Sequence, residues 1–244
     1  MRTSLNHKFA PFNQWKAILQ AFQEARFSLL WVFKKLTYTF GLFWLPLAAI
    51  IFFSVNYLLP GYPITHVKLS LSLFEVCFTV FLVPYFAYKF IQTKKGIPVE
   101  TFKEFLTETI TPLIFASIKA MLVILRHLII LFVPGVIKLL RLSLLHYTVF
   151  FDPRVRTKKL SPLEAAQETT KGVLLSIIVI YMIFILIELY LPKGLFHLLT
   201  IGVTSEDLFL NSMANTLTYC FIFYLHAFKY TVMTHFYFIL RDRK

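Results

Sequence analysis

Five of the charged side chains inside apolar stretches of the sequence could, by their types, support ion pairing or anion binding. Glu75 and Glu188 are acidic, whereas Arg126, Lys138 and Arg141 are basic. A charge at the centre of a membrane helix costs roughly 2.5–3.5 kcal/mol on insertion scales, so such residues are functional candidates by default. Counted from the outer ends of the predicted helices, all five lie at similar depth in the outer half of the membrane. We favour ion pairs that dock helices, and the alternative is a positively charged pocket for an anion such as a lipid phosphate.

Other chemistry has little support in the sequence. No histidine pair has the spacing of a metal site, and Cys77 and Cys220 lack a CxxC partner. No glycine-rich phosphate loop, nucleophile elbow or carboxylate dyad is present. His226 and Lys229 share a face of the last apolar stretch, where a histidine usually bonds to a neighbouring polar group. We therefore expect no metal, no cofactor and no catalytic residue.

The composition identifies the elements that must position these charges. The chain of 244 residues is 58% hydrophobic and 15% charged, whereas a soluble domain is about 45–50% apolar and about 25% charged. The mean hydropathy is +0.70. These values exclude a soluble, disordered or fibrous protein and predict an all-α, polytopic membrane helical bundle.

Six stretches have the length of about 20 residues that a membrane-spanning helix needs. They are Phe40–Leu59, Leu69–Ile91, Leu113–Val133, Pro134–Phe151, Val173–Leu191 and Thr216–Leu240. We expect one integral membrane domain over residues 1–244, with an amphipathic N-terminal segment at 1–39 and a six-span bundle at 40–240. The gaps between the spans are too short for a folded soluble domain, so an attached enzyme domain is not expected.

The third and fourth spans are joined by Val133-Pro134-Gly135, the only break in the stretch from Pro112 to Phe151. A Pro-Gly pair is typical of a tight reversal. The two flanking segments are both basic, so the stretch must cross the membrane an even number of times. We favour a full hairpin, and the alternative is a re-entrant hairpin that stops short of the far side.

Lysine and arginine positions predict the orientation. Eighteen of the 25 basic residues lie in the N-terminal segment, the two longer connections and the C-terminal end, whereas only Lys68 and Lys193 lie in the opposite loops. Cytoplasmic loops carry this excess, so both termini are predicted to be cytoplasmic. The net charge of +13 is therefore a topology signal and an attraction to anionic lipid. Nucleic-acid binding is not expected, because no basic face is free of the membrane.

Amphipathic helices are predicted on the cytoplasmic side before spans 1, 3 and 5. The first places Trp15, Ile18, Leu19, Phe22 and Ala25 on one face, and the second begins after Pro98. The third opens with Ser161-Pro162-Leu163-Glu164, which combines an N-cap serine, a proline at the first helical position and the glutamate of a capping box. Such helices either lie in the membrane interface or pack on the bundle as connectors.

One part of the sequence resembles a known superfamily. It comprises Arg141-Leu142-Ser143, the run from Tyr147 to Asp152, Ser161-Pro162-Leu163-Glu164-Ala165-Ala166 and Thr170-Lys171-Gly172. This pattern is similar to a broad superfamily of bacterial six-helix integral membrane proteins. The superfamily includes the membrane domain attached to some glycerophosphodiester phosphodiesterases and related uncharacterised families. The likeness covers about 30 residues and implies a six-helix fold. The chain departs from the family in having 28 phenylalanines and only seven glycines, and the phosphodiesterase activity is not carried over.

These observations predict a multi-pass protein of the bacterial inner membrane without enzymatic activity. We expect a structural or assembly component of the envelope that docks membrane lipids, a membrane-protein partner or a second copy of itself. The alternative is a transporter or lipid-handling protein that binds an anionic substrate at the outer-half charge cluster.

Overall fold

The computed structural model describes residues 13–59, 62–204 and 207–243, and all regular structure within these ranges is helical. The helices are α1 (Gln14–Leu36), the π-helical turn η1 (Thr37–Gly41), α2 (Leu42–Leu58), α3 (Ile64–Lys94), α4 (Phe102–Ile130), α5 (Phe132–Leu142), α6 (Leu145–Phe151), α7 (Pro153–Arg156), α8 (Pro162–Thr170), α9 (Leu174–Leu199) and α10 (Leu208–Asp242). Five helices in the described residues are long and apolar enough to cross a membrane, and six when the two parts of α3, which meet at a bend of 42°, count as one span. The predicted all-α membrane bundle is confirmed.

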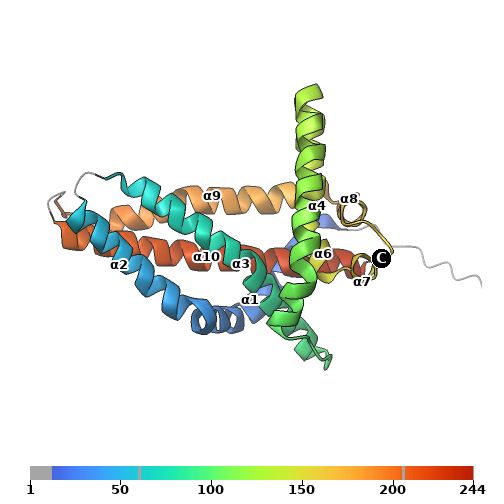
Figure 1. Cartoon of the computed structure of the whole chain (residues 1–244), viewed down its shortest axis with the longest axis horizontal. Helices are drawn as coiled ribbons and strands as arrows, with labels where there is room; N and C mark the ends of the chain where they lie inside the picture. The colour runs from blue at the N-terminus through green and yellow to red at the C-terminus, as the bar shows by residue number, and fades with distance from the viewer. Residues whose placement is uncertain (1–12, 60–61, 205–206, 244) are drawn as a thin grey trace, which may run out of the picture.

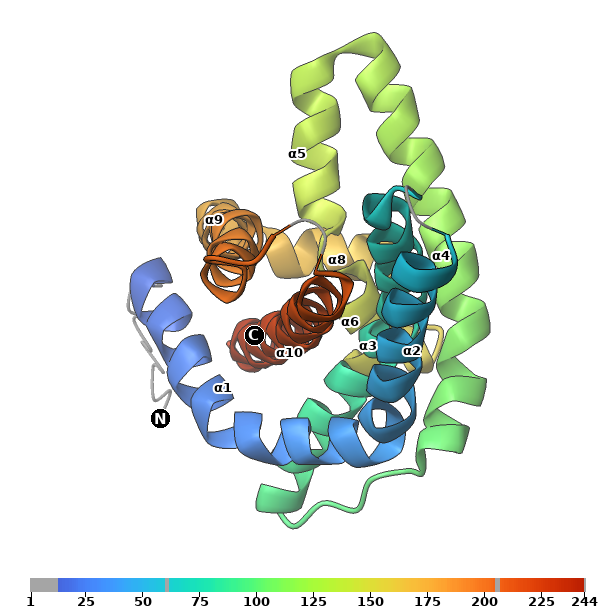
Figure 2. The same ribbon diagram turned by 90° about the vertical axis from the view of Figure 1, so that its left-hand side faces the viewer.

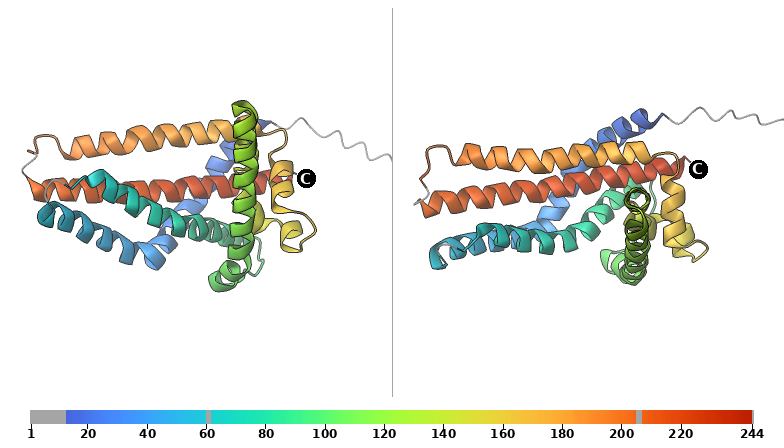
Figure 3. Two further views of the ribbon diagram at one scale, coloured as in Figure 1. Left: turned by 45° about the horizontal axis from the view of Figure 1, so that its top comes forward. Right: turned by 90° about the horizontal axis from the view of Figure 1, so that it is seen from above.

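Four helices form the main body of the molecule. The helices α2, α3, α9 and α10 extend in a common direction, as Figures 1 and 3 show. The middle position belongs to α10, which contacts α1, α2, α3 and α9. Its large aromatic side chains, Tyr219, Phe223, Phe236 and Tyr237, are buried in the core. We call the end of this four-helix unit that holds Lys94, Leu174 and Asp242 the C-terminal end, and the opposite end the far end.

The predicted N-terminal amphipathic helix is present as α1, and residues 1–12 of that segment lie outside the described residues. It continues through η1 into α2 as one bent helix, Gln14–Leu58. Its buried stripe is Ala17, Ile18, Ala21, Ala25, Ser28, Val32 and Leu36. Of the predicted apolar face, Ile18 and Ala25 lie in this stripe, whereas Trp15 and Leu19 are exposed. The small residues every fourth position explain the difference, because they allow close approach to a neighbouring helix such as α10.

The α4–α5 hairpin runs across the four-helix unit at its C-terminal end. Figure 1 shows α4 crossing the direction of α9 and α10, and Figure 2 shows both hairpin arms lengthwise where α10 is seen end-on. These arms correspond to the third and fourth predicted spans. A flat bilayer is crossed in one direction, so the four-helix unit and the hairpin cannot both cross the same bilayer.

The reversal between α4 and α5 occurs at Leu131, whose backbone is extended, and not at the predicted Val133-Pro134-Gly135. Gly135 lies instead in the first turn of α5, where the arms meet closely. A Cβ added there would lie 2.9 Å from the Leu128 Cα. The Pro-Gly pair therefore lies in the first turn of α5, where proline is favourable and Gly135 allows close packing against α4, and it does not form the turn itself.

Short helices α6, α7 and α8 connect the hairpin to α9. The predicted capping box of α8 is confirmed, since the Ser161 hydroxyl accepts a hydrogen bond from the Glu164 N–H and the Glu164 carboxylate accepts one from the Ser161 N–H. A second capping box, formed by Thr101 and Glu104, starts α4 and was not predicted. Gly172, with a φ of +77°, ends the connection before α9.

Candidate functional site

Glu75 and Glu188 converge on one side of α10. The Glu75 Oε1 lies 2.9 Å from the His226 Nδ1, and the Lys229 ammonium donates a hydrogen bond of 2.8 Å to the Glu188 Oε1. The His226 Nε2 is 4.0 Å from the same Glu188 oxygen. The four side chains therefore form a continuous polar chain from α3 across α10 to α9, which we call the acid–base chain. Its formal charges sum to zero when His226 is protonated.

The spacing of residues on α10 and the bend of α3 position the side chains of the acid–base chain. His226 and Lys229 are three residues apart on α10, so they share a face. Glu75 lies at the bend of α3, where the Thr79 hydroxyl donates a hydrogen bond of 3.0 Å to the Glu75 carbonyl. Such back-bonding by threonine often bends a helix. The Glu75 side chain is thereby held inside the four-helix unit rather than at its surface.

Burial makes Glu75 the most constrained member. Its side chain is fully buried, and its Oε2 has no hydrogen-bond partner among the described residues. The Glu188 and Lys229 side chains are 25% and 22% exposed. Close to Glu75 along α3, the Tyr219 hydroxyl donates to the Leu71 carbonyl and accepts from the Trp44 indole N–H. The acid–base chain thus has a wholly buried end and a partly open end.

The three basic residues of the predicted cluster lie elsewhere. Arg126 and Arg141 are exposed on the α4–α5 hairpin, and the Lys138 ammonium donates to the Gln167 side chain at 3.4 Å. No ion pair joins them to Glu75 or Glu188 within the described residues. The structure therefore brings together the two acids but not the five charges, because the hairpin runs across the four-helix unit. The partners that sequence reasoning did not assign are His226 and Lys229, although their shared face was visible.

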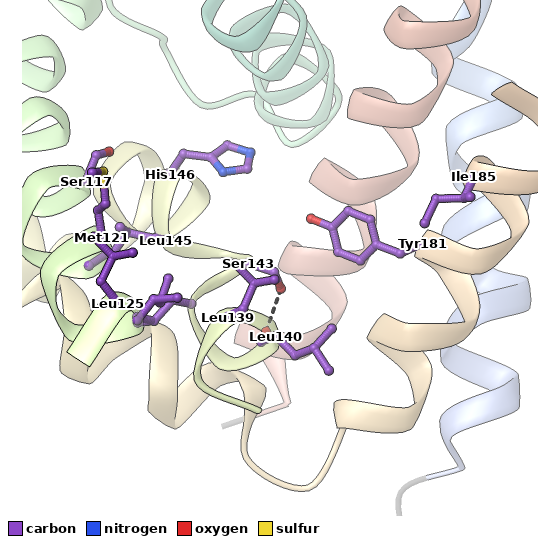
Figure 4. A pocket seen from close by; sticks show the side chains of 13 residues that line it. Ser117, Met121, Leu125, Leu139, Leu140, Ser143, Leu145, His146, Tyr181 and Ile185 are labelled. Atoms are coloured by element: carbon purple, nitrogen blue, oxygen red, sulfur yellow. Dashed lines mark hydrogen bonds between the residues drawn. The ribbon is translucent and has the colours of Figure 1, made fainter. Parts of the chain in front are cut away.

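A cavity of about 690 Å³ lies between the hairpin, α6 and α9. Figure 4 shows Ser117, Met121 and Leu125 of α4 on one side, with Tyr181 and Ile185 of α9 on the other. Its walls are almost entirely apolar. The exception of interest is His146, whose buried Nε2 has no hydrogen-bond partner among the described residues. Small-molecule sites have this general character, an apolar cavity of about 300–1,000 Å³ with few polar groups.

A second polar centre fixes the α7 segment at the C-terminal end. Arg154 pairs with Asp152 at 2.9 Å and with Glu168 at 3.1 Å. Arg156 pairs with Glu100 at 2.8 Å and also with Glu108. The hydrogen bonds that the guanidinium groups donate to these carboxylates raise the pKa of both arginines. These contacts connect α4, α7 and α8 and hold the base of the hairpin in place.

No group of three histidine, cysteine, aspartate or glutamate side chains in the described part of the chain is arranged to hold a metal ion. No family model, curated protein or solved structure matches the chain.

Proposed function

We propose that this is a non-enzymatic membrane component that docks lipids or a partner membrane protein through its α4–α5 hairpin. The observation that carries the proposal is the direction of the hairpin across the four-helix unit (Figures 1 and 2). When α2, α3, α9 and α10 cross the membrane, the hairpin lies along one membrane surface.

The side chains of α4 support a position against lipid. Ile114, Phe115, Ile118, Met121 and Leu122 are all exposed. An exposed apolar face on a helix at the membrane surface inserts into the boundary between headgroups and acyl chains. The same face can contact a membrane-protein partner or a second copy of the chain.

The acid–base chain supports a structural role in the four-helix unit. Each of its charges has a partner of opposite sign or a titratable partner within 4.0 Å. Paired charges in a membrane interior commonly join helices. In this proposal Glu75, His226, Glu188 and Lys229 hold α3, α10 and α9 in register, while docking occurs on the hairpin.

The proposed location is the bacterial inner membrane, with both termini in the cytoplasm. Lys94, Arg154, Arg156 and Arg241 lie at the C-terminal end of the unit, whereas Lys68 and Lys193 lie toward the far end. This asymmetry supports a cytoplasmic C-terminal end. The resemblance to the bacterial six-helix superfamily supports the same location.

Single cysteines in a Cys-less background test the arrangement. A cysteine replacing Thr65, at the far end, should react with an impermeant external thiol reagent, whereas one replacing Lys103 should react only after permeabilisation. A cysteine replacing Leu131, at the hairpin tip, should behave like the Lys103 variant or stay protected. External labelling at Leu131 would show that the hairpin crosses the membrane and would overturn the proposal.

A second candidate is a lipid-handling or transport protein that binds an anionic amphiphile. The apolar cavity beside His146 favours it, because its unpartnered Nε2 could bond to a polar group of a bound lipid. Ala120 lines this cavity and is nearly buried, so an Ala120→Phe variant fills the space. Loss of a copurifying lipid from that variant, and not from an Ile110→Phe control, would support lipid handling.

A further inference from the structure

A groove of about 890 Å³ separates α4 from the α7–α8 segment at the C-terminal end. Its basic residues are Lys119 on the α4 side and, on the other side, Arg156 of α7 and Lys158 and Lys159 of the connection between α7 and α8. Its acidic members are Glu108 and Glu164. The groove is separate from both the acid–base chain and the cavity beside His146.

The acids of the groove are already engaged. Glu108 contacts the Arg156 guanidinium. The Glu164 carboxylate accepts hydrogen bonds from the Ser161 N–H at 3.3 Å and from its hydroxyl at 2.7 Å. Glu108 therefore has a cationic partner on the opposite wall of the groove, whereas Glu164 is hydrogen-bonded to the neutral Ser161 within its own wall.

The lysines have no such partners. Lys119, Lys158 and Lys159 are exposed, and none of them forms an ion pair with any described residue. The four basic and two acidic side chains that line the groove therefore sum to a net charge of +2. The lysine ammonium group is a point charge that commonly binds phosphate.

The rest of the groove is apolar. Phe115, Ala116, Val149 and Leu160 form part of its lining. The exposed apolar face of α4 continues from Phe115 to Leu122. The groove therefore places lysine side chains beside an apolar surface. This combination fits an amphiphile, with a charged headgroup and a hydrocarbon chain, better than a soluble phosphate compound.

We propose that this groove binds an anionic phospholipid, with its phosphate at Lys119, Lys158 and Lys159 and its acyl chains along α4. The inference rests on the proposed function, because a hairpin along the membrane surface places the groove at headgroup level. Beyond the proposed function, the groove defines the class of lipid that is bound and the lysines that recognise its phosphate.

Native mass spectrometry of the detergent-solubilised full chain tests the inference, with phosphatidylglycerol, phosphatidylcholine and inorganic phosphate as separate probes. The groove variant combines Lys119→Gln, Lys158→Gln and Lys159→Gln. A control with the same charge change combines exchanges to Gln at Lys103 and Lys171, near the same end, and Lys193 at the far end; all three lysines are exposed. Circular dichroism of each variant checks that it is folded.

The wild-type chain and the control should retain phosphatidylglycerol in preference to phosphatidylcholine. The groove variant should bind phosphatidylglycerol roughly 100-fold more weakly, given a contribution of about a factor of five for each lysine near an anionic surface. Equal losses in both variants would show non-specific charge attraction and overturn the site. Displacement of bound phosphatidylglycerol by millimolar inorganic phosphate would show a site for soluble phosphate and also contradict the inference. Labelling at Leu131 is read independently, so failure of the hairpin arrangement is distinguishable from failure of this site.

Discussion

Breaking the Glu188–Lys229 pair should destabilise the four-helix unit, and the two single variants should differ in a defined order. At their separation of 2.8 Å, two unit charges attract by about 6 kcal/mol at an effective dielectric constant of about 20. Much of this attraction offsets the cost of removing the charges from water, and loss of one partner from a buried pair costs about 3–5 kcal/mol. Lys229→Leu leaves Glu188 with His226 at 4.0 Å, so its cost should fall at the lower end. Glu188→Leu leaves the Lys229 ammonium without a carboxylate, so its cost should fall at the upper end.

The double variant Glu188→Leu/Lys229→Leu should recover most of the stability, because it removes both charges from a low-dielectric setting. Its unfolding free energy should lie within about 1 kcal/mol of the wild type. Lys193→Leu is the control, since Lys193 is exposed on the same helix and forms no ion pair among the described residues. That control should change the unfolding free energy by no more than about 0.5 kcal/mol.

Unfolding in mixed detergent micelles, followed by tryptophan fluorescence, measures these differences. Trp44 is buried and packs against Phe40 and Phe74, so in a Trp15→Phe/Trp31→Phe background its emission reports on the four-helix unit. Single variants that each cost less than about 1 kcal/mol would refute the reasoning. So would a double variant as unstable as the sum of the singles, because that result denies any coupling between the two charges.

Three further outcomes are expected. Gly135→Val should splay the hairpin and increase proteolysis near Leu128, because an added Cβ meets the backbone of the other arm at 2.9 Å; unchanged proteolysis would contradict the close packing. Ser161→Ala should lower the melting temperature by an amount equivalent to about 1 kcal/mol, and addition of Glu164→Ala should cost little more, because both belong to one capping box; additive losses would show that the two residues act separately. Arg156→Lys should cost about 1 kcal/mol in detergent unfolding, since an ammonium cannot reproduce the contacts with both glutamates. Because the pKa of Arg156 is raised, the contribution of its ion pairs to the free energy of unfolding is present below the ordinary arginine pKa and is lost only above it. The stability difference between Arg156→Lys and the wild type should therefore not change between about pH 6 and pH 9. A strong change over that range would indicate another titrating group.

Much of the architecture could be predicted because it depends on local signals. Apolar length predicts the helices, and the Ser161-Pro162-Glu164 pattern predicts where α8 begins. The position of the hairpin turn could not be read in the same way. Pro134 and Gly135 are typical turn residues, but proline is also favourable in the first turn of a helix and glycine at a close helix contact.

The direction of the hairpin has no local signal. The stretch around Arg126 is as apolar as a span, so hydropathy predicts a crossing whichever way the helix points. Only the packing of its base, held by Arg156 and the α7–α8 connection, sets its direction. The same packing decides the candidate site, because it keeps Arg126 and Arg141 away from Glu75. The shared face of His226 and Lys229 was the one sequence signal for the observed partners.

The depth of α4 in a bilayer tests the central claim most directly. Spin labels at Phe115 and Leu122, both exposed on α4, should report the same depth by collision with oxygen and a polar nickel complex in phosphatidylglycerol–phosphatidylcholine vesicles. Labels at Leu175 and Met182, equally separated on α9, should differ in depth by about 10 Å at helical rise. A difference of that size along α4 would show that the hairpin crosses the membrane and would contradict the account.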